Sequence, residues 1–212
     1  MEAVDEWALP FDAHSASSDA GLLADGYVID ADEWHAHVHG SLDYERYFPQ
    51  PDAALRQLLL SLPQQGRLWI FTNADDKHAA KCLELLGIAD VFGERVITFE
   101  SLQSVAKTKG LPLLCKPSLH SFHAALELAG AEPATTCFLD DSIRNVEGAL
   151  NAQISAVLVG STSRVDGALA EVAHIHRLRC AVPSLWGDIG SSSEDVASLA
   201  PQDEAPAEEM PQ

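Results

Sequence analysis

The middle of the chain alternates between two patterns of apolar residues. Short apolar runs bounded by polar residues predict buried strands at residues 67–72, 95–99, 135–140 and 155–160. Apolar residues three and four apart predict helices at residues 52–62, 76–87, 118–130, 142–153 and most of 165–182. A loop that ends in "CKPS" is expected at residues 100–117. Strands and helices that alternate with short connections predict an α/β fold, in which a Rossmann-like parallel sheet carries helices on both faces.

The two ends of the chain differ from this middle. Residues 1–20 mix Ala, Ser and Asp without a period and predict a disordered N-terminus. Residues 30–40 predict a helix, with Asp30 or Asp32 as its N-cap. From residue 187 to residue 212, Gly, Ser, Pro and acidic residues dominate, which predicts a disordered acidic tail. The folded α/β core is therefore expected at residues 51–186.

Composition and charge narrow the classes of partner. The chain has 212 residues and is 47% hydrophobic, which suits one globular domain with a substantial core. The formal net charge of −19 opposes binding to nucleic acid and to anionic membranes. The sequence has no apolar run of the roughly 18 residues that a membrane span requires. Four cysteines without a CxxC pair, and an acidic N-terminus without a basic leader, predict reduced thiols in the cytoplasm and leave the nucleus open.

Polar residues stand at the ends of two predicted strands, and a lysine stands just before a predicted helix. Because ligands of parallel sheets bind at the carboxyl ends of the strands, such residues are candidates for chemistry. Thr72 and Asn73 end the strand at 67–72, where a hydroxyl, an amide and the N–H groups of a helix start can hold a phosphate. An ordinary helix cap is the alternative. Lys116 is fixed by Pro117 in an extended turn and can neutralise a phosphate or a carboxylate, unless it is an ordinary surface lysine.

Two adjacent carboxylates, Asp140 and Asp141, end the strand at 135–140. Carboxylates this close repel each other unless a cation lies beside them. Hard oxygen ligands favour Mg²⁺, which keeps several waters and bridges to a substrate phosphate. The alternative is a single Asp that caps the helix at 142–153. A cap needs one carboxylate, so the second one favours a Mg²⁺ site.

These groups occur in an order that resembles the haloacid dehalogenase-like (HAD-like) hydrolase superfamily. The segments "IFTNADDKHAAKCLELLGIADVF", "CKPSLHSFHAALELAG" and "CFLDDSIRNVEGA" look like its pyrimidine 5′-nucleotidase branch, and the resemblance covers about residues 26–186. It implies a HAD-type phosphohydrolase that uses Mg²⁺. It also implies a small phosphomonoester as substrate, most like a nucleoside monophosphate. The segment 21–50 then looks like part of a helical cap.

The resemblance also implies a role for each candidate residue. Thr72 and Asn73 would bind the transferring phosphoryl group, and Lys116 would neutralise the nucleophile and the phosphate. Asp140 and Asp141 would hold Mg²⁺, with Asn145 in support. The family reaction starts with attack by an Asp on phosphorus, and a second Asp two residues later protonates the leaving group.

The stretch "GYVIDADEWHAHVHG", residues 26–40, is where that pair of carboxylates could lie, as Asp30 and Asp32. Only Tyr27–Ile29 remain as a strand before it, and Trp34 stands where a small residue is wanted. The resemblance assigns this stretch to the cap. The first strand, with its nucleophile, is therefore expected to be missing, as in a truncated enzyme.

Three hypotheses stay open. The first is a nucleotide phosphohydrolase whose nucleophile segment lies upstream of Met1. The second is a non-catalytic pseudo-phosphatase that binds Mg²⁺ or phosphate. The third is a phosphatase without a cap, in which Asp30 is the nucleophile. Whether the chain is an enzyme, its exact substrate and its oligomeric state are left undecided by the sequence.

Overall fold

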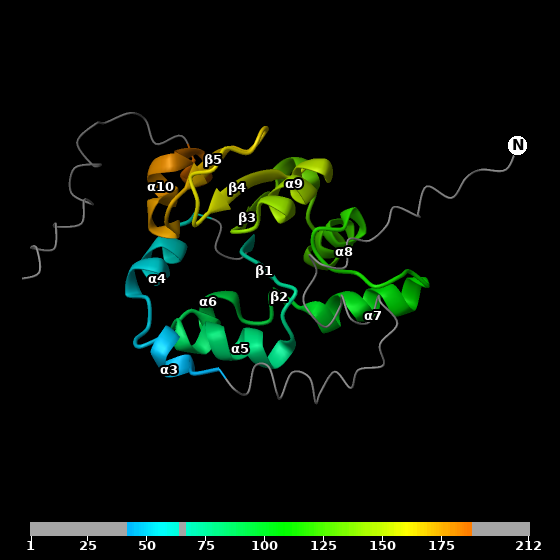
Figure 1. Ribbon diagram of the computed structural model, residues 1–212, viewed down its shortest axis with the longest axis horizontal. Helices are drawn as coiled ribbons and strands as arrows, with labels where there is room; N and C mark the ends of the chain where they lie inside the picture. The colour runs from blue at the N-terminus through cyan, green and yellow to red at the C-terminus, as the bar shows by residue number, and fades with distance from the viewer. Residues whose placement is uncertain (1–41, 64–66, 188–212) are drawn as a thin grey trace, which may run out of the picture.

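The computed structural model describes residues 42–63 and 67–187, in which short parallel strands are flanked by helices (Figure 1). The strands of these ranges are β1 (Ile70–Phe71), β2 (Val96–Ile97), β3 (Cys137–Asp140), β4 (Ser155–Val159) and β5 (Ala170–Val172). They form two parallel sheets, β1–β2 and β3–β4–β5. The predicted α/β fold with parallel sheets and flanking helices is confirmed. The segments predicted at 1–20, at 30–40 and beyond 187 lie outside the described residues.

Helices connect and cover these strands. The α-helices are α3 (Tyr44–Tyr47), α4 (Ala53–Leu60), α5 (Asp76–Leu85), α6 (Ala89–Phe92), α7 (Phe99–Lys109), α8 (Leu119–Ala129), α9 (Ile143–Asn151) and α10 (Leu178–Ala181). Short 3₁₀ turns are η3 (Pro133–Thr135), η4 (Ile175–Arg177) and η5 (Pro183–Trp186). The predicted helices at 52–62, 76–87, 118–130 and 142–153 are confirmed as α4, α5, α8 and α9. None of the helices in the described ranges is long and apolar enough to cross a membrane.

The side chains of β4 alternate between two layers of core. Ala156 and Leu158 pack on one face against Phe122 of α8 and Val146 of α9. Val157 packs on the other face, in a cluster completed by Val172, Leu178, Val182 and Trp186. Successive side chains of a strand point to opposite faces, so each face of the sheet needs its own cover. Helices α8 and α9 cover one face and α10 with η5 covers the other (Figure 1).

Two helices join the two sheets into one body. On one face, α8 contributes Phe122 to the cluster under β4 and Ala125 to the cluster under β2. On the other face, α4 places Leu58 against the three-stranded sheet and Leu55 against β1 and β2. Shared helices of this kind fix the position of β1 relative to β3, although the two strands are not paired.

The expected loop at 100–117 is wrong over most of its length, because α7 spans Phe99–Lys109. Thr98 accepts a hydrogen bond from the Ser101 N–H, and the Ser101 hydroxyl accepts one from the Thr98 N–H, which is a reciprocal capping box. Gly110 ends the helix in the left-handed conformation, at φ 65°. The buried residues Phe99, Leu102 and Ala106 have helical spacing. These signals were present in the sequence.

The prediction that residues 165–182 are mostly helical is also wrong. Within this range Ala170–Val172 form β5, which pairs with β4, and only Leu178–Ala181 form an α-helix. A three-residue strand is too short to show a period of two. Its pairing with β4 depends on contacts that sequence periodicity does not report.

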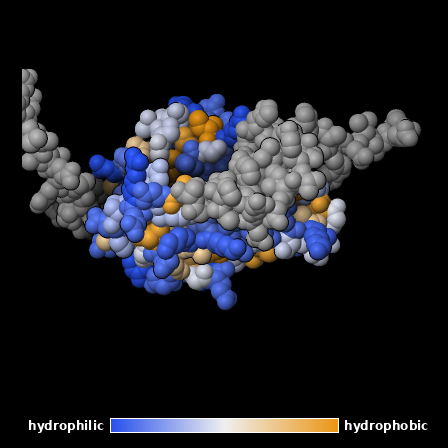
Figure 2. All heavy atoms as spheres, turned by 60° about the horizontal axis from the view of Figure 1, so that its bottom comes forward, coloured by the Kyte–Doolittle hydropathy of each residue, from blue (hydrophilic) through white to orange (hydrophobic). Residues whose placement is uncertain are grey.

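Polar residues cover most of the described surface that Figure 2 shows, and apolar ones lie between them. The large apolar side chains that are exposed within the described ranges come from different elements; they are Leu42, Tyr47, Leu60, Leu119, Leu128, Ile143 and Leu169. Single exposed apolar residues are common on the surfaces of folded proteins.

Asp52 begins α4 and links it to the C-terminal part of the core. Its carboxylate accepts a hydrogen bond from the Leu55 N–H at 2.8 Å. The same carboxylate lies 2.9 Å from Nε2 of His176. Burial favours a higher pKa for Asp52, but the hydrogen bonds from Leu55 and His176 lower its pKa below the usual value. The folded state therefore prefers the ionised form of Asp52.

Replacement of Asp52 with alanine is expected to lower the free energy of unfolding by about 1 kcal/mol at pH 7, since an N-cap acceptor is lost. Because the pKa of Asp52 is lowered on folding, its contribution is fully present above the unfolded pKa of about 3.9, begins to fall below that pH, and is lost as the pH falls through the lower pKa of the folded state. Urea denaturation from pH 7 to pH 3 measures both effects. A difference between the two proteins that persisted unchanged at pH 3 would contradict this role.

Candidate active site

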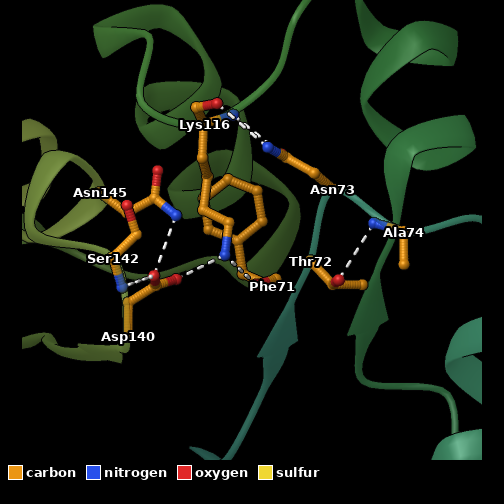
Figure 3. Close-up of polar contacts among 8 residues, drawn as sticks. All are labelled: Phe71, Thr72, Asn73, Ala74, Lys116, Asp140, Ser142 and Asn145. Atoms are coloured by element: carbon orange, nitrogen blue, oxygen red, sulfur yellow. Dashed lines mark hydrogen bonds and ion pairs between the residues drawn. The ribbon is translucent and has the colours of Figure 1, made fainter. Parts of the chain in front are cut away.

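Thr72 follows β1 and shapes the turn into α5. Its N–H donates to the carbonyl of Ile97 (2.9 Å), so the residue still pairs with β2. Its hydroxyl oxygen accepts the N–H of Ala74 at 3.0 Å (Figure 3). Asp75, which is buried, then begins the helix by accepting the N–H of His78. The hydroxyl of Thr72 is therefore held at the carboxyl end of β1, with its own hydrogen still able to donate.

Asn73 is bound to the backbone of Lys116. Its Nδ2 donates to the Lys116 carbonyl (3.0 Å), and its Oδ1 accepts the Lys116 N–H (2.9 Å). Figure 3 shows the amide turned toward the turn that carries Lys116. The expected contact of Asn73 with a phosphoryl group stays a prediction, because this amide already has two partners.

Lys116 is buried, with 8% of its side chain exposed, and is therefore not an ordinary surface lysine. Its Nζ donates to the carbonyl of Phe71 at 2.9 Å and to Oδ2 of Asp140 at 2.6 Å. The same atom lies 5.1 Å from the ring centre of Phe71 and 5.3 Å from that of Phe138, within the range of cation–π attraction. An ammonium group has three donors, so one is left beyond these two hydrogen bonds.

Asp140 ends β3 and receives three hydrogen bonds. Besides Lys116, the N–H of Ser142 and Nδ2 of Asn145 both donate to its Oδ1, each at 2.9 Å (Figure 3). Ser142 is the N-cap of α9, but its own side chain makes no cap hydrogen bond. The carboxylate of Asp140 is thus oriented by the helix start that follows it, and 7% of the side chain is exposed.

Asp141 differs from its neighbour because it is exposed. A Cβ built on Gly160, just after β4, would lie 4.0 Å from Cβ of Asp141, which places this residue beside the end of β4. The side chain of Asp140 is 7% exposed, and the cation beside it is Lys116.

The charges at this edge of the sheets fit a divalent cation. Lys116, Asp140 and Asp141 together carry one net negative charge, and a bound phosphate would add more. Within the described ranges no cluster of three His, Cys, Asp or Glu side chains could hold a metal. Mg²⁺ needs only one or two carboxylates, and completes its shell with water and phosphate oxygens. Asp140 keeps a lone pair on Oδ2, and Asp141 lies next to it, so these residues fit Mg²⁺.

The structure brings Asn73, Lys116 and Asp140 together by direct hydrogen bonds, and places Thr72 and Asp141 next to them in the chain. Phe71 and Phe138 flank the ammonium group, and no motif in the sequence pointed to them. Phe71 is the last residue of β1, one residue before Thr72, and Phe138 is the second residue of β3, two residues before Asp140. Both rings contact the ring of Phe122 edge to face, at 5.6 and 5.2 Å between ring centres.

Comparison with known proteins identifies the family to which the chain is similar. A family model described as haloacid dehalogenase-like hydrolase matches residues 8–153. Phosphate metabolism protein 8 of Saccharomyces cerevisiae is 31% identical over 144 residues, which are 65% of this chain and 43% of that protein. The chain therefore spans less than half the length of this curated relative.

Two solved structures have a similar fold. They are β-phosphoglucomutase from Clostridium difficile (16% identity, TM-score 0.50, 82% of this chain and 70% of that one) and a HAD family hydrolase from Deinococcus radiodurans with bound phosphate and sodium (16%, 0.50, 82% and 79%). At this identity the likeness shows the fold alone. Since the family model covers more than half of the sequence, the chain belongs to the haloacid dehalogenase-like hydrolases.

Proposed function

We propose that this protein is a Mg²⁺-dependent phosphohydrolase that acts on nucleoside monophosphates, with the pyrimidine nucleotides UMP and CMP as first candidates. The observation that carries the proposal is the buried pair of Lys116 and Asp140, held at the carboxyl ends of β1 and β3 next to Thr72. A buried cation with a remaining donor, beside a hydroxyl donor, is suited to bind a phosphoryl group. The preference for pyrimidine nucleotides rests on the sequence resemblance alone.

Each residue has a separate task in the proposed site. Thr72 donates its hydroxyl hydrogen, and Lys116 its remaining N–H, to phosphoryl oxygens. Asp140 and Asp141 would hold Mg²⁺, which supplies positive charge to the phosphoryl oxygens when it is bound. Ser142 and Asn145 keep the carboxylate of Asp140 in its orientation. Since hydrogen bonds already stabilise this carboxylate, Asp140 is poorly suited to attack phosphorus.

The nucleophile in the proposed reaction is a different carboxylate, which has to reach the space between Thr72 and Asp140. Asp30 is the candidate that the sequence offers, and it lies outside the described residues. The alternative, in which the nucleophile strand is missing, also concerns residues outside them. Replacement of Asp30 with asparagine separates the two: phosphate release is abolished only if Asp30 is the nucleophile.

A second candidate function is a non-catalytic protein that binds Mg²⁺ or phosphate. The observation that favours it is the bonding of Asp140. Its carboxylate accepts hydrogen bonds from Lys116, Ser142 and Asn145, so it is suited to hold an ion and poorly suited to attack phosphorus. Under this hypothesis Lys116 and Asp140 keep an anion site without turnover.

One experiment tests both functions. The purified 212-residue protein is incubated with UMP or CMP and millimolar Mg²⁺, and released phosphate is measured with and without EDTA. Phosphate release that EDTA removes is the expected result for the hydrolase. Thermal stabilisation by phosphate and Mg²⁺ without release supports the binding protein. Neither release nor stabilisation would contradict both proposals.

A further inference from the structure

The side chain of Asn73 holds Lys116 at both of its backbone hydrogen-bonding groups. Donation from Nδ2 to the Lys116 carbonyl and acceptance of the Lys116 N–H by Oδ1 form a two-point contact, at 3.0 and 2.9 Å. The two residues are 43 positions apart. A two-point contact fixes both the position and the rotation of a peptide segment, whereas one hydrogen bond leaves it free to turn.

The carboxyl end of β1 also holds the ammonium group of Lys116. The carbonyl of Phe71 accepts the ammonium Nζ at 2.9 Å, two residues before Asn73. The backbone of Lys116 is therefore fixed at residue 73 and its ammonium at residue 71. The long side chain of Lys116 thus runs back along the carboxyl end of β1, and its Nζ reaches Asp140 on β3.

We propose that Asn73 is a positioning residue, which acts on phosphate through Lys116 and not by direct contact. The amide fixes the turn from which the lysine side chain extends, so that the ammonium meets Phe71, Asp140 and the phosphoryl group at once. The inference rests on the proposed function for the ligand of Lys116. The contact between Asn73 and Lys116 stands without it.

The first test measures Lys116 itself. In the Asn73→Ala variant, the amine of Lys116 is expected to react about tenfold faster with acetic anhydride, because the loss of one or two net hydrogen bonds makes opening of the turn easier. Peptide mass spectrometry gives the rate at this lysine. Lys109, which is exposed, serves as the internal reference. Should Asn73→Ala not fold, Asn73→Asp keeps the size of the side chain and one of its two hydrogen bonds.

The second test measures binding of inorganic phosphate with Mg²⁺ by calorimetry in four proteins: wild type, Asn73→Ala, Lys116→Met and the double variant. In the protein that keeps Lys116, Asn73→Ala is expected to weaken phosphate binding about tenfold. It should have no further effect once Lys116 is methionine, since contacts that act through one residue are not additive. The control is Asn151→Ala at the exposed end of α9, which should change neither readout.

The outcomes separate the inference from the function. If Asn73→Ala lowered phosphate affinity equally with Lys116 present and with Lys116→Met, Asn73 would contact phosphate directly, and the inference would be overturned. Unchanged labelling of Lys116 in Asn73→Ala, or in Asn73→Asp where the alanine variant does not fold, would overturn it as well. If Lys116→Met bound phosphate like the wild type, the proposed function would lose its site. The labelling rates would still decide whether Asn73 positions the lysine.

Discussion

Replacement of Lys116 with methionine is expected to lower the free energy of unfolding by about 3–5 kcal/mol, the usual cost of removing one partner from a buried ion pair. Methionine leaves the carboxylate of Asp140 without its cation in a place where 7% of the side chain is exposed. The hydrogen bonds from Ser142 and Asn145 remain, but they compensate only part of the charge. Urea denaturation of the two proteins at pH 7 measures the difference.

Two further variants show whether burial is the cause. Lys109 pairs with Glu127 on the surface, where 44% and 60% of the two side chains are exposed, so Lys109→Met should cost no more than about 1 kcal/mol. The double variant Lys116→Met/Asp140→Asn removes both charges and should recover much of the lost stability. Equal losses for Lys116→Met and Lys109→Met would contradict the buried pair.

The sequence singled out candidate residues for the site, but it did not predict their contacts. The run "CKPS" singled out Lys116, yet the same sequence is equally compatible with an ordinary surface lysine. The partners that distinguish the two are Asp140 and Phe71, which are 24 and 45 positions away. No local pattern reports such contacts. For the same reason, the two adjacent carboxylates looked alike, although only 7% of the Asp140 side chain is exposed and the next residue, Asp141, lies on the surface.

Helices that repeat their apolar spacing over several turns were predictable from the sequence, and very short elements were not. Helices α8 and α9 bury one face over about three turns, so their apolar spacing stands out. The strand β5 has three residues, and its place is set by pairing with β4. Helix α7 is different, because its capping box and its final Gly110 could have been recognised. The helical spacing of Phe99, Leu102 and Ala106 points the same way as these capping signals, so α7 was predictable from the sequence.

Replacement of Gly148 with alanine is expected to destabilise the protein by about 1–3 kcal/mol through overpacking. On an exposed helical position the same change would stabilise by about 1 kcal/mol, because alanine is the better helix former. In α9, however, a Cβ would lie 2.6 Å from the carbonyl oxygen of Pro117 and 2.8 Å from Cε2 of Phe122. Both distances are too short for a real contact, and one of the atoms belongs to backbone that cannot rotate away.

The position of Gly148 connects this packing to the site. Pro117 directly follows Lys116, so a displaced Pro117 would shift the turn that Asn73 holds. Gly148→Ala should therefore also weaken phosphate binding, whereas Glu147→Ala, on the exposed side of the same helix, should change stability by less than about 0.5 kcal/mol and leave binding intact. Urea denaturation and calorimetry with phosphate measure the two effects. A Gly148→Ala protein more stable than the wild type would show that α9 does not press on the lysine turn, and that glycine is not needed there.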